Sequence, residues 1–263
     1  MIRTFLEWLW RLIFGERDSG KWSGFDDGPM LSSCWRGHNA KNRMMNMLSP
    51  HMPESVLEEY IQWMLDRGCN VAHVILCNEK DGEYGGYCPY GPVMDGQLHD
   101  GYLDVMRSRL KRLQEDFATV VWLLTDDGPS FNRKPESFYV DLIADCQEQG
   151  LFDGSPLLVL GLELDEYFNS GQVQRLCGVM RQITHKPVGV HQTSDKLSYA
   201  AHGDFVLWQT NPGKSSARIK KLVTAAIAKV GNKPLVAFEM ARQEARELCE
   251  AAIKAGAAGV GNW

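Results

Sequence analysis

Eight short runs of apolar and β-forming residues recur along the chain, and they constrain its fold more than any other feature. The runs cover residues 30–35, 70–77, 119–125, 157–164, 187–193, 205–210, 234–240 and 257–263. Most are apolar at successive positions, which is typical of strands that are buried on both faces of a parallel sheet. Segments with helical spacing lie between them, for example 56–65, 103–113 and 219–230.

This alternation of strands and helices predicts an α/β fold, a (β/α)8 TIM barrel. An open doubly wound sheet usually has a glycine-rich first turn, and neither GxGxxG nor GxxxxGK follows any of the runs. The fifth and sixth runs begin only 18 residues apart, at 187 and 205, so we expect a short helix around 195–201. No linker or internal repeat interrupts the pattern, which predicts a single domain over residues 1–263.

The first fourteen residues are strongly apolar but are interrupted by Glu7 and Arg11, and no small-residue cleavage site follows them. This pattern favours an amphipathic helix packed on the barrel over a signal peptide or a membrane anchor. Because the eighth run closes the chain, we expect this N-terminal helix to take the place of the eighth barrel helix. No localisation follows from the sequence.

The charge balance and the cysteines exclude several function classes. The chain has 28 Lys and Arg residues against 33 Asp and Glu residues, and its positive charges form no block, so nucleic acid is not an expected partner. Its seven cysteines are scattered without a CxxC pair, which indicates neither a disulfide framework nor a zinc ribbon and is compatible with cytoplasmic synthesis. We expect no cofactor and no membrane partner.

Polar side chains end most of the apolar runs. In a TIM barrel the carboxyl ends of the strands form the active site, so these residues are the site candidates. They are Arg36, Asp126, Glu163, Asp165, Glu166, His191, Trp208, Gln209, Glu239 and Trp263. The long segment 78–99 adds Tyr84, Tyr87 and Tyr90 among glycines and prolines, which indicates irregular structure with exposed aromatic rings.

Glu239 is the most informative of these residues. It ends a buried strand, where a carboxylate costs desolvation energy unless it is paired or used. The fourth strand, which faces the seventh across an eight-stranded barrel, also ends in acidic residues. Two opposed carboxylates at one rim are what glycoside hydrolysis requires, because one gives a proton to the leaving oxygen and the other attacks or activates water.

These motifs resemble the clan of retaining barrel glycosidases that includes the family 5 cellulases and mannanases. In that clan the acid/base Glu follows an Asn at the end of strand four, some members reading Asn-Glu-Tyr, and this chain has Asp165-Glu166-Tyr167. The nucleophile closes strand seven, as in Phe238-Glu239, and an aromatic residue at the end of strand eight, here Trp263, floors the sugar subsite. The resemblance implies a retaining hydrolase of a β-linked polysaccharide or oligosaccharide, with Glu239 as nucleophile and Glu166 as general acid/base.

The chain departs from that pattern at Asp165, because an ionised Asp cannot donate a hydrogen bond as the Asn does. Strict alternation along a strand points Glu163 and Asp165 inward, and a bulge is needed to bring Glu166 round. The proton donor is therefore Glu163 or Glu166. The expected substrate contacts are Trp263, Asp165, His191, Trp208, Gln209, Arg36, Asp126 and Tyr87.

Three alternatives stay open at this point. The acidic stretch of strand four also resembles the family 18 chitinase signature, although the catalytic position then falls on Tyr167. A divalent metal in an isomerase or hydrolase barrel is a second alternative, with Glu163, Asp165, Asp126 and His191 as ligands. A third is a barrel that binds sugar without cleaving it and stacks it on Tyr84, Tyr87, Tyr90, Trp208 and Trp263. The sugar and its linkage are not readable from the sequence.

Overall fold

A computed structural model of the chain describes residues 22–33, 45–78, 86–91, 96–124, 134–210, 215–238 and 246–261. The strands are β1 (Met30–Leu31), β2 (Val71–Cys77), β3 (Ala118–Leu124), β4 (Leu157–Gly161), β5 (Val188–Gln192), β6 (Phe205–Gln209), β7 (Leu235–Phe238) and β8 (Gly259–Val260). All pair in parallel, in the order β1-β8-β7-β6-β5-β4-β3-β2. A parallel bridge between Ser32 and Val71 joins β1 to β2, so the sheet forms a nearly closed (β/α)8 barrel and confirms the predicted fold.

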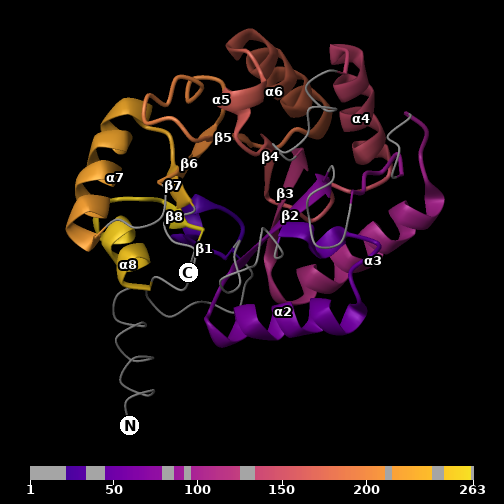
Figure 1. Cartoon of the computed structure of the whole chain (residues 1–263), viewed down its shortest axis with the longest axis horizontal. Helices are drawn as coiled ribbons and strands as arrows, with labels where there is room; N and C mark the ends of the chain where they lie inside the picture. The colour runs from indigo at the N-terminus through magenta and orange to yellow at the C-terminus, as the bar shows by residue number, and fades with distance from the viewer. Residues whose placement is uncertain are drawn as a thin grey trace.

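Helices surround the barrel (Figure 1). They are α2 (Glu54–Asp66), α3 (Asp100–Asp116), α4 (Glu136–Glu148), the short α5 (Leu164–Tyr167), α6 (Ser170–Thr184), α7 (Ser216–Val230) and α8 (Arg246–Lys254), with 3-10 turns at Phe25–Asp27 and Met45–Leu48. Local sequence sets their starts: Asn169 and Gln172 form a reciprocal capping box on α6, and the Ser215 hydroxyl accepts from the Arg218 amide at the start of α7.

The core has two layers, which the alternation of side chains along the strands separates. Val120 and Trp122 of β3 point into the barrel interior, whereas Val121 and Leu123 face the helices. Gly189 leaves room in the interior, because a Cβ there would lie 2.4 Å from the ring of Phe205. The interior is therefore a packed core and not a channel, as is usual in this fold.

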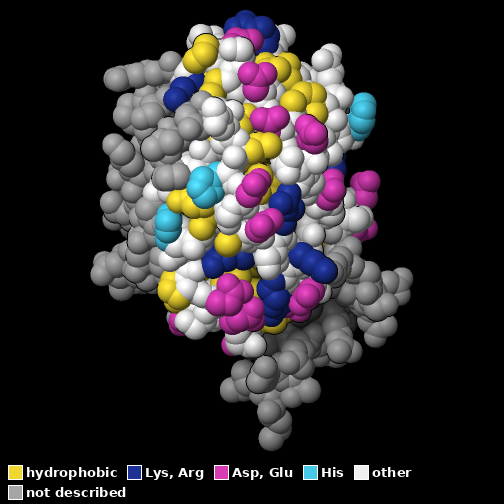
Figure 2. All heavy atoms as spheres, turned by 90° about the vertical axis from the view of Figure 1, so that its right-hand side faces the viewer, with side chains coloured by type: hydrophobic (Ala, Val, Ile, Leu, Met, Phe, Trp, Pro, Cys, Tyr) yellow, Lys and Arg dark blue, Asp and Glu magenta, His cyan; other side chains and the backbone are white. Residues whose placement is uncertain are grey.

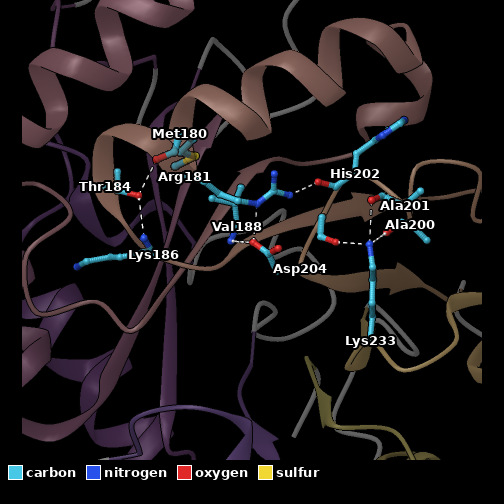
Figure 3. Close-up of polar contacts among 11 residues, drawn as sticks. Met180, Arg181, Thr184, Lys186, Val188, Ala200, Ala201, His202, Asp204 and Lys233 are labelled. Atoms are coloured by element: carbon cyan, nitrogen blue, oxygen red, sulfur yellow. Dashed lines mark hydrogen bonds and ion pairs between the residues drawn. The ribbon is translucent and has the colours of Figure 1, made fainter.

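The connection between β5 and β6 differs from our expectation of a short helix around 195–201. It contains turns and bends without a helix, and a lysine side chain from the turn before β7 holds it. The Lys233 ammonium donates to the carbonyl oxygens of Ala200, Ala201 and Gly203 at 2.8, 2.9 and 2.6 Å (Figure 3). Twelve residues between the strands are too few for a helix with its two loops, so a side-chain cation satisfies the carbonyls instead.

Asp204, just before β6, fixes the same connection from the other side. Its Oδ2 accepts from Arg181 Nε at 2.7 Å and from the Val188 amide at 2.8 Å (Figure 3). Arg181 also donates to the carbonyl oxygen of His202. These contacts tie the start of β6 to α6 and to β5, so the connection is fixed by both of its neighbours.

The predicted N-terminal helix, at residues 2–14, lies outside the described residues. None of the helices that are described has the length and apolar character needed to cross a membrane. On the face that carries α3 and α4, acidic and basic side chains are interleaved (Figure 2). Arg112 illustrates this, since it binds both Glu58 and Asp116 at 2.7 Å.

Candidate active site

Glu163 stands at the rim of the barrel, two residues beyond the end of β4. The Leu162 amide still donates to the Leu124 carbonyl of β3 at 3.1 Å, and Glu163 then turns the chain with a left-handed backbone, φ 45° and ψ 43°. This conformation costs a residue with a side chain roughly 1–2 kcal/mol. The Glu163 amide donates to Nδ1 of His191 on β5 at 2.8 Å, and this partly buried contact holds the turn in place.

The left-handed turn places Glu163 and Glu166 differently. Leu164, the first residue of α5, is buried, and its Cδ2 would lie 3.1 Å from a Cβ at Gly161. Glu166 follows two positions later, about 200° round the helix, and it is exposed. Glu163 is partly buried at the strand end itself. The rim position therefore belongs to Glu163, and the bulge that would bring Glu166 inward is not formed.

Asp165 has a structural position. Its two carboxylate oxygens accept from the amides of Thr193 and Ser194, each at 2.9 Å. These bonds tie α5 to the residues that follow β5. An Asp suits this place better than the Asn of the related motif, because two acceptors meet two backbone donors. Both Asp165 oxygens thus already accept backbone amides, and the expectation that Asp165 contacts sugar is not supported.

His191 connects the rim to the barrel interior. Its ring is fully buried, with centroids 5.5 Å from Trp122 and 5.6 Å from Phe238. Burial, followed by the neighbouring His73, lowers its pKa to about 3, so the imidazole is neutral at ordinary pH. Because Nδ1 accepts from Glu163, the proton is assigned to Nε2, which has no hydrogen-bond partner within the described residues.

A second buried histidine organises the other side of the interior. Trp122 Nε1 donates to His73 Nδ1 at 2.9 Å, and His73 Nε2 donates to the Ser32 hydroxyl at 2.8 Å. That hydroxyl donates in turn to the Val260 carbonyl oxygen at 2.9 Å. Burial lowers the pKa of His73 to about 3. The chain of bonds runs from β3 through β2 and β1 to β8 and uses both ring nitrogens.

Four rings together close the barrel beneath the rim. Phe238 lies 5.1 Å from His73 and 5.3 Å from Trp122, and His191 completes the layer. This layer leaves the rim above it, at the carboxyl ends of the strands, as the candidate site. The sequence reading did not identify Trp122 and Phe238 as this floor, although their place in the inward alternation of β3 and β7 was the signal that could have shown it.

The two candidates on β6 face opposite sides of the sheet. Trp208 is 2% exposed and packs in the outer cluster between the sheet and the helices, so it is not placed to stack on a sugar. Gln209 follows Phe205 and Leu207 in the inward alternation. Its Oε1 is buried and has no partner among the described residues. Gln209 is thus a partly exposed polar residue at the rim whose buried side-chain oxygen has no partner among the described residues.

The prediction of exposed aromatic rings between β2 and α3 is wrong for two of the three tyrosines. Tyr87 is fully buried and donates to the Ile75 carbonyl oxygen at 3.0 Å, and Tyr90 is 2% exposed and donates to Asp145 at 2.6 Å. Both rings belong to the outer core cluster. Tyr87 is therefore a core residue with no exposed surface, and Tyr84 lies outside the described residues.

Four further candidates, Arg36, Asp126, Glu239 and Trp263, lie outside the described residues and stay predictions. Glu239 directly follows Phe238 of the ring layer in the sequence. Within the part of the chain that is described, no group of three or more His, Cys, Asp or Glu side chains is arranged to hold a metal ion.

No protein-family model matches this chain, and no curated protein matches its sequence. Solved structures do share its fold. A glycoside hydrolase family 5 protein from Bacteroides vulgatus ATCC 8482 has a TM-score of 0.63 at 14% identity, over 89% of this chain and 57% of that one. An endo-1,4-beta-mannanase from Eisenia fetida has a TM-score of 0.60 at 11% identity, over 94% and 86% of the two chains.

A GH5-4 broad specificity endoglucanase from an uncultured bacterium also has this fold, with a TM-score of 0.54 at 9% identity over 88% of this chain and 86% of that one. The chain spans 57% of the length of the family 5 protein named above, and 50% and 60% of the length of two other glycoside hydrolases that it matches. At these identities the comparisons establish the barrel fold that the chain shares with glycoside hydrolases.

Proposed function

We propose that this barrel is a glycoside hydrolase that cleaves a β-linked polysaccharide or oligosaccharide by a retaining, two-carboxylate mechanism. The observation that carries the proposal is Glu163, a carboxylate held at the rim of β4 by the bond from its own amide to buried His191. The fold shared with glycoside hydrolases, family 5 among them, supports the same reading.

We assign the two catalytic roles to Glu239 and Glu163, the latter in place of Glu166. Glu163 would protonate the glycosidic oxygen as its bond to the anomeric carbon breaks, while the Glu239 carboxylate attacks that carbon and forms a glycosyl ester. Glu163 would then take a proton from water, which attacks the anomeric carbon and releases Glu239. Gln209, inward-facing at the rim, would hydrogen-bond a sugar hydroxyl.

Two observations speak against the alternatives. Of the five rings expected to stack a sugar in a barrel that only binds it, Tyr87, Tyr90 and Trp208 are buried in the core, and Tyr84 and Trp263 lie outside the described residues. A metal at the rim would need Asp165 and His191, but both Asp165 oxygens and His191 Nδ1 already accept backbone amides. Hydrolysis by carboxylates therefore explains the described part of the rim best.

A panel of β-linked polysaccharides, scored by the reducing ends released, tests the proposed activity. We expect at least one substrate to be cleaved with retention of the anomeric configuration, and the rate to be unchanged by EDTA. Loss of activity with EDTA would favour a metal enzyme, and binding of an oligosaccharide without cleavage would favour a binding barrel. An inverted product would contradict the retaining mechanism.

The same Glu→Gln substitution at two positions tests which residue is the proton donor. Glu163→Gln should lower the rate on substrates with poor leaving groups by about 10²–10⁴-fold and affect activated aryl glycosides much less. Glu166→Gln is the matched control and should stay within a few-fold of the unmodified protein. The reverse order of the two variants would return the acid role to Glu166.

A further inference from the structure

Cys77 and Cys88 lie side by side at the carboxyl end of β2. Asn78, which follows Cys77, and Tyr87, which precedes Cys88, form an antiparallel bridge. In this bridge each amide donates to the carbonyl oxygen of the other residue, at 2.9 and 2.8 Å. In an antiparallel pair, the positions beside such a bridge face each other without hydrogen bonds, with Cα atoms only about 4.5 Å apart. Cys77 and Cys88 occupy those positions, and their sulfur atoms are 2.8 Å apart.

Neighbouring contacts hold this pair in place. Tyr87, which precedes Cys88, donates its hydroxyl to the Ile75 carbonyl of β2, and Tyr90 donates to Asp145 of α4. Both cysteine side chains are fully buried. A Cα separation near 4.5 Å is within the range that a disulfide needs, so the bond can form here without a rearrangement of the backbone.

We propose that Cys77 and Cys88 are a redox pair, oxidised to a disulfide that joins the end of β2 to residues 86–91. The oxidant is a small-molecule disulfide. One protein thiolate attacks a sulfur of that molecule and releases the first small thiol, and the second protein thiolate then attacks the mixed disulfide and releases the other. Two protein thiols are oxidised, one small disulfide is reduced, and the two protein protons end on the two small thiols.

Burial determines when this exchange takes place. No oxidant reaches either sulfur while residues 86–91 are packed, and desolvation raises the pKa of the Cys77 thiol, so little thiolate forms in the folded protein. Exchange is therefore slow in the native state and fast during refolding. Once formed, the bond is protected from reductants by the same burial.

A third buried thiol offers a competing partner. Burial raises the pKa of the Cys146 thiol on α4, and Cys88 lies close enough to raise it further. Cys146 has no position in the ladder beside the bridge between Asn78 and Tyr87, however. We therefore expect the bond to join Cys77 to Cys88 and to leave Cys146 reduced.

Thiol mapping of the full-length chain tests the pairing. The chain is refolded with oxidised and reduced glutathione, blocked with iodoacetamide after denaturation, and digested for mass spectrometry. Of the seven cysteines, we expect Cys77 and Cys88 to escape blocking by iodoacetamide and to appear in one pair of disulfide-linked peptides. A link through Cys146, a lasting glutathione adduct on either cysteine, or seven blocked thiols would overturn the proposal.

Thermal melting gives a second readout. Closing a loop of this length should raise the melting temperature of the oxidised protein over the reduced one by about 5 °C. Cys88→Ala should abolish this difference, whereas Cys177→Ala, a buried cysteine on α6, should retain it. The same difference in Cys88→Ala, or none in the unmodified protein, would contradict the pair. Neither measurement depends on glycosidase activity.

Discussion

A single imidazole nitrogen links the rigid barrel interior to the proposed proton donor. His191 Nδ1 accepts the amide of Glu163, whose backbone is left-handed, and the ring is locked between Trp122 and Phe238. Loss of the acceptor would leave a partly buried amide unsatisfied, which costs about 1–3 kcal/mol. In the proposed mechanism His191 therefore acts through Glu163, as a positioning residue.

This role predicts different outcomes for two substitutions of His191. His191→Phe keeps a ring but loses the acceptor, so we expect kcat to fall by about 10- to 100-fold with little change in KM, together with lower stability. His191→Asn presents an oxygen close to the place of Nδ1 and should recover part of kcat. Steady-state kinetics on one oligosaccharide checks this, and equal kcat values for the two variants would argue against a positioning role.

At the scale of single residues, the sequence located the acidic rim of strand four but could not choose between its members. Alternation along a strand was the available rule, and it no longer applies to Asp165 and Glu166, because the left-handed backbone of Glu163 ends the strand before them. The same rule overlooked that Asp165 bonds two backbone amides, since those donors come from a segment 28 and 29 residues away. Contacts over such separations are set by the fold and not by local pattern.

Among the elements, the connection from β5 to β6 depends on one cation. Lys233→Met would leave three carbonyl oxygens without their ammonium donor, so we expect a loss of about 2–3 kcal/mol in the free energy of unfolding. Lys229→Met is the matched control, because the Lys229 ammonium donates only to the Asp195 carbonyl oxygen among the contacts described, and it should cost about 1 kcal/mol or less.

Urea unfolding of the two variants measures this difference. Equal losses would mean that the three carbonyl oxygens are satisfied by water when Lys233 is removed. A larger loss for Lys233→Met would show that the Lys233 ammonium satisfies carbonyl oxygens that the expected helix would have paired.

The elements were more predictable than the residues between them. Each of the eight apolar runs overlaps a strand, because a run buried on both faces is a strong local signal. The last run was expected over 257–263, yet β8 covers only Gly259–Val260, since pairing with β1 and β7 sets its length. The burial of Tyr87 was not predictable, because its glycine- and proline-rich surroundings resemble those of an exposed loop.

For the whole molecule, the two buried histidines make stability depend on pH. His73 and His191 have pKa values of about 3 in the folded state, against an ordinary value of 6.5. Below pH 6.5 these two histidines bind protons in the unfolded chain but stay neutral in the folded chain. The free energy of unfolding therefore falls as the pH falls. Each histidine contributes about 2 kcal/mol of this loss between pH 7 and pH 5, or about 4 kcal/mol together.

Urea unfolding at pH 7, 6 and 5 tests this expectation within a window that few other groups disturb. Asp27 and Glu136 have pKa values below their ordinary range and titrate at lower pH, whereas His202, with a lowered pKa, adds a smaller loss of the same sign. His191→Asn removes one of the two main titrations, so its loss between pH 7 and pH 5 should be about half that of the unmodified protein. A stability that stays constant over this range would mean that the interior admits a charged imidazole, which is incompatible with a closed layer of rings beneath the proposed site.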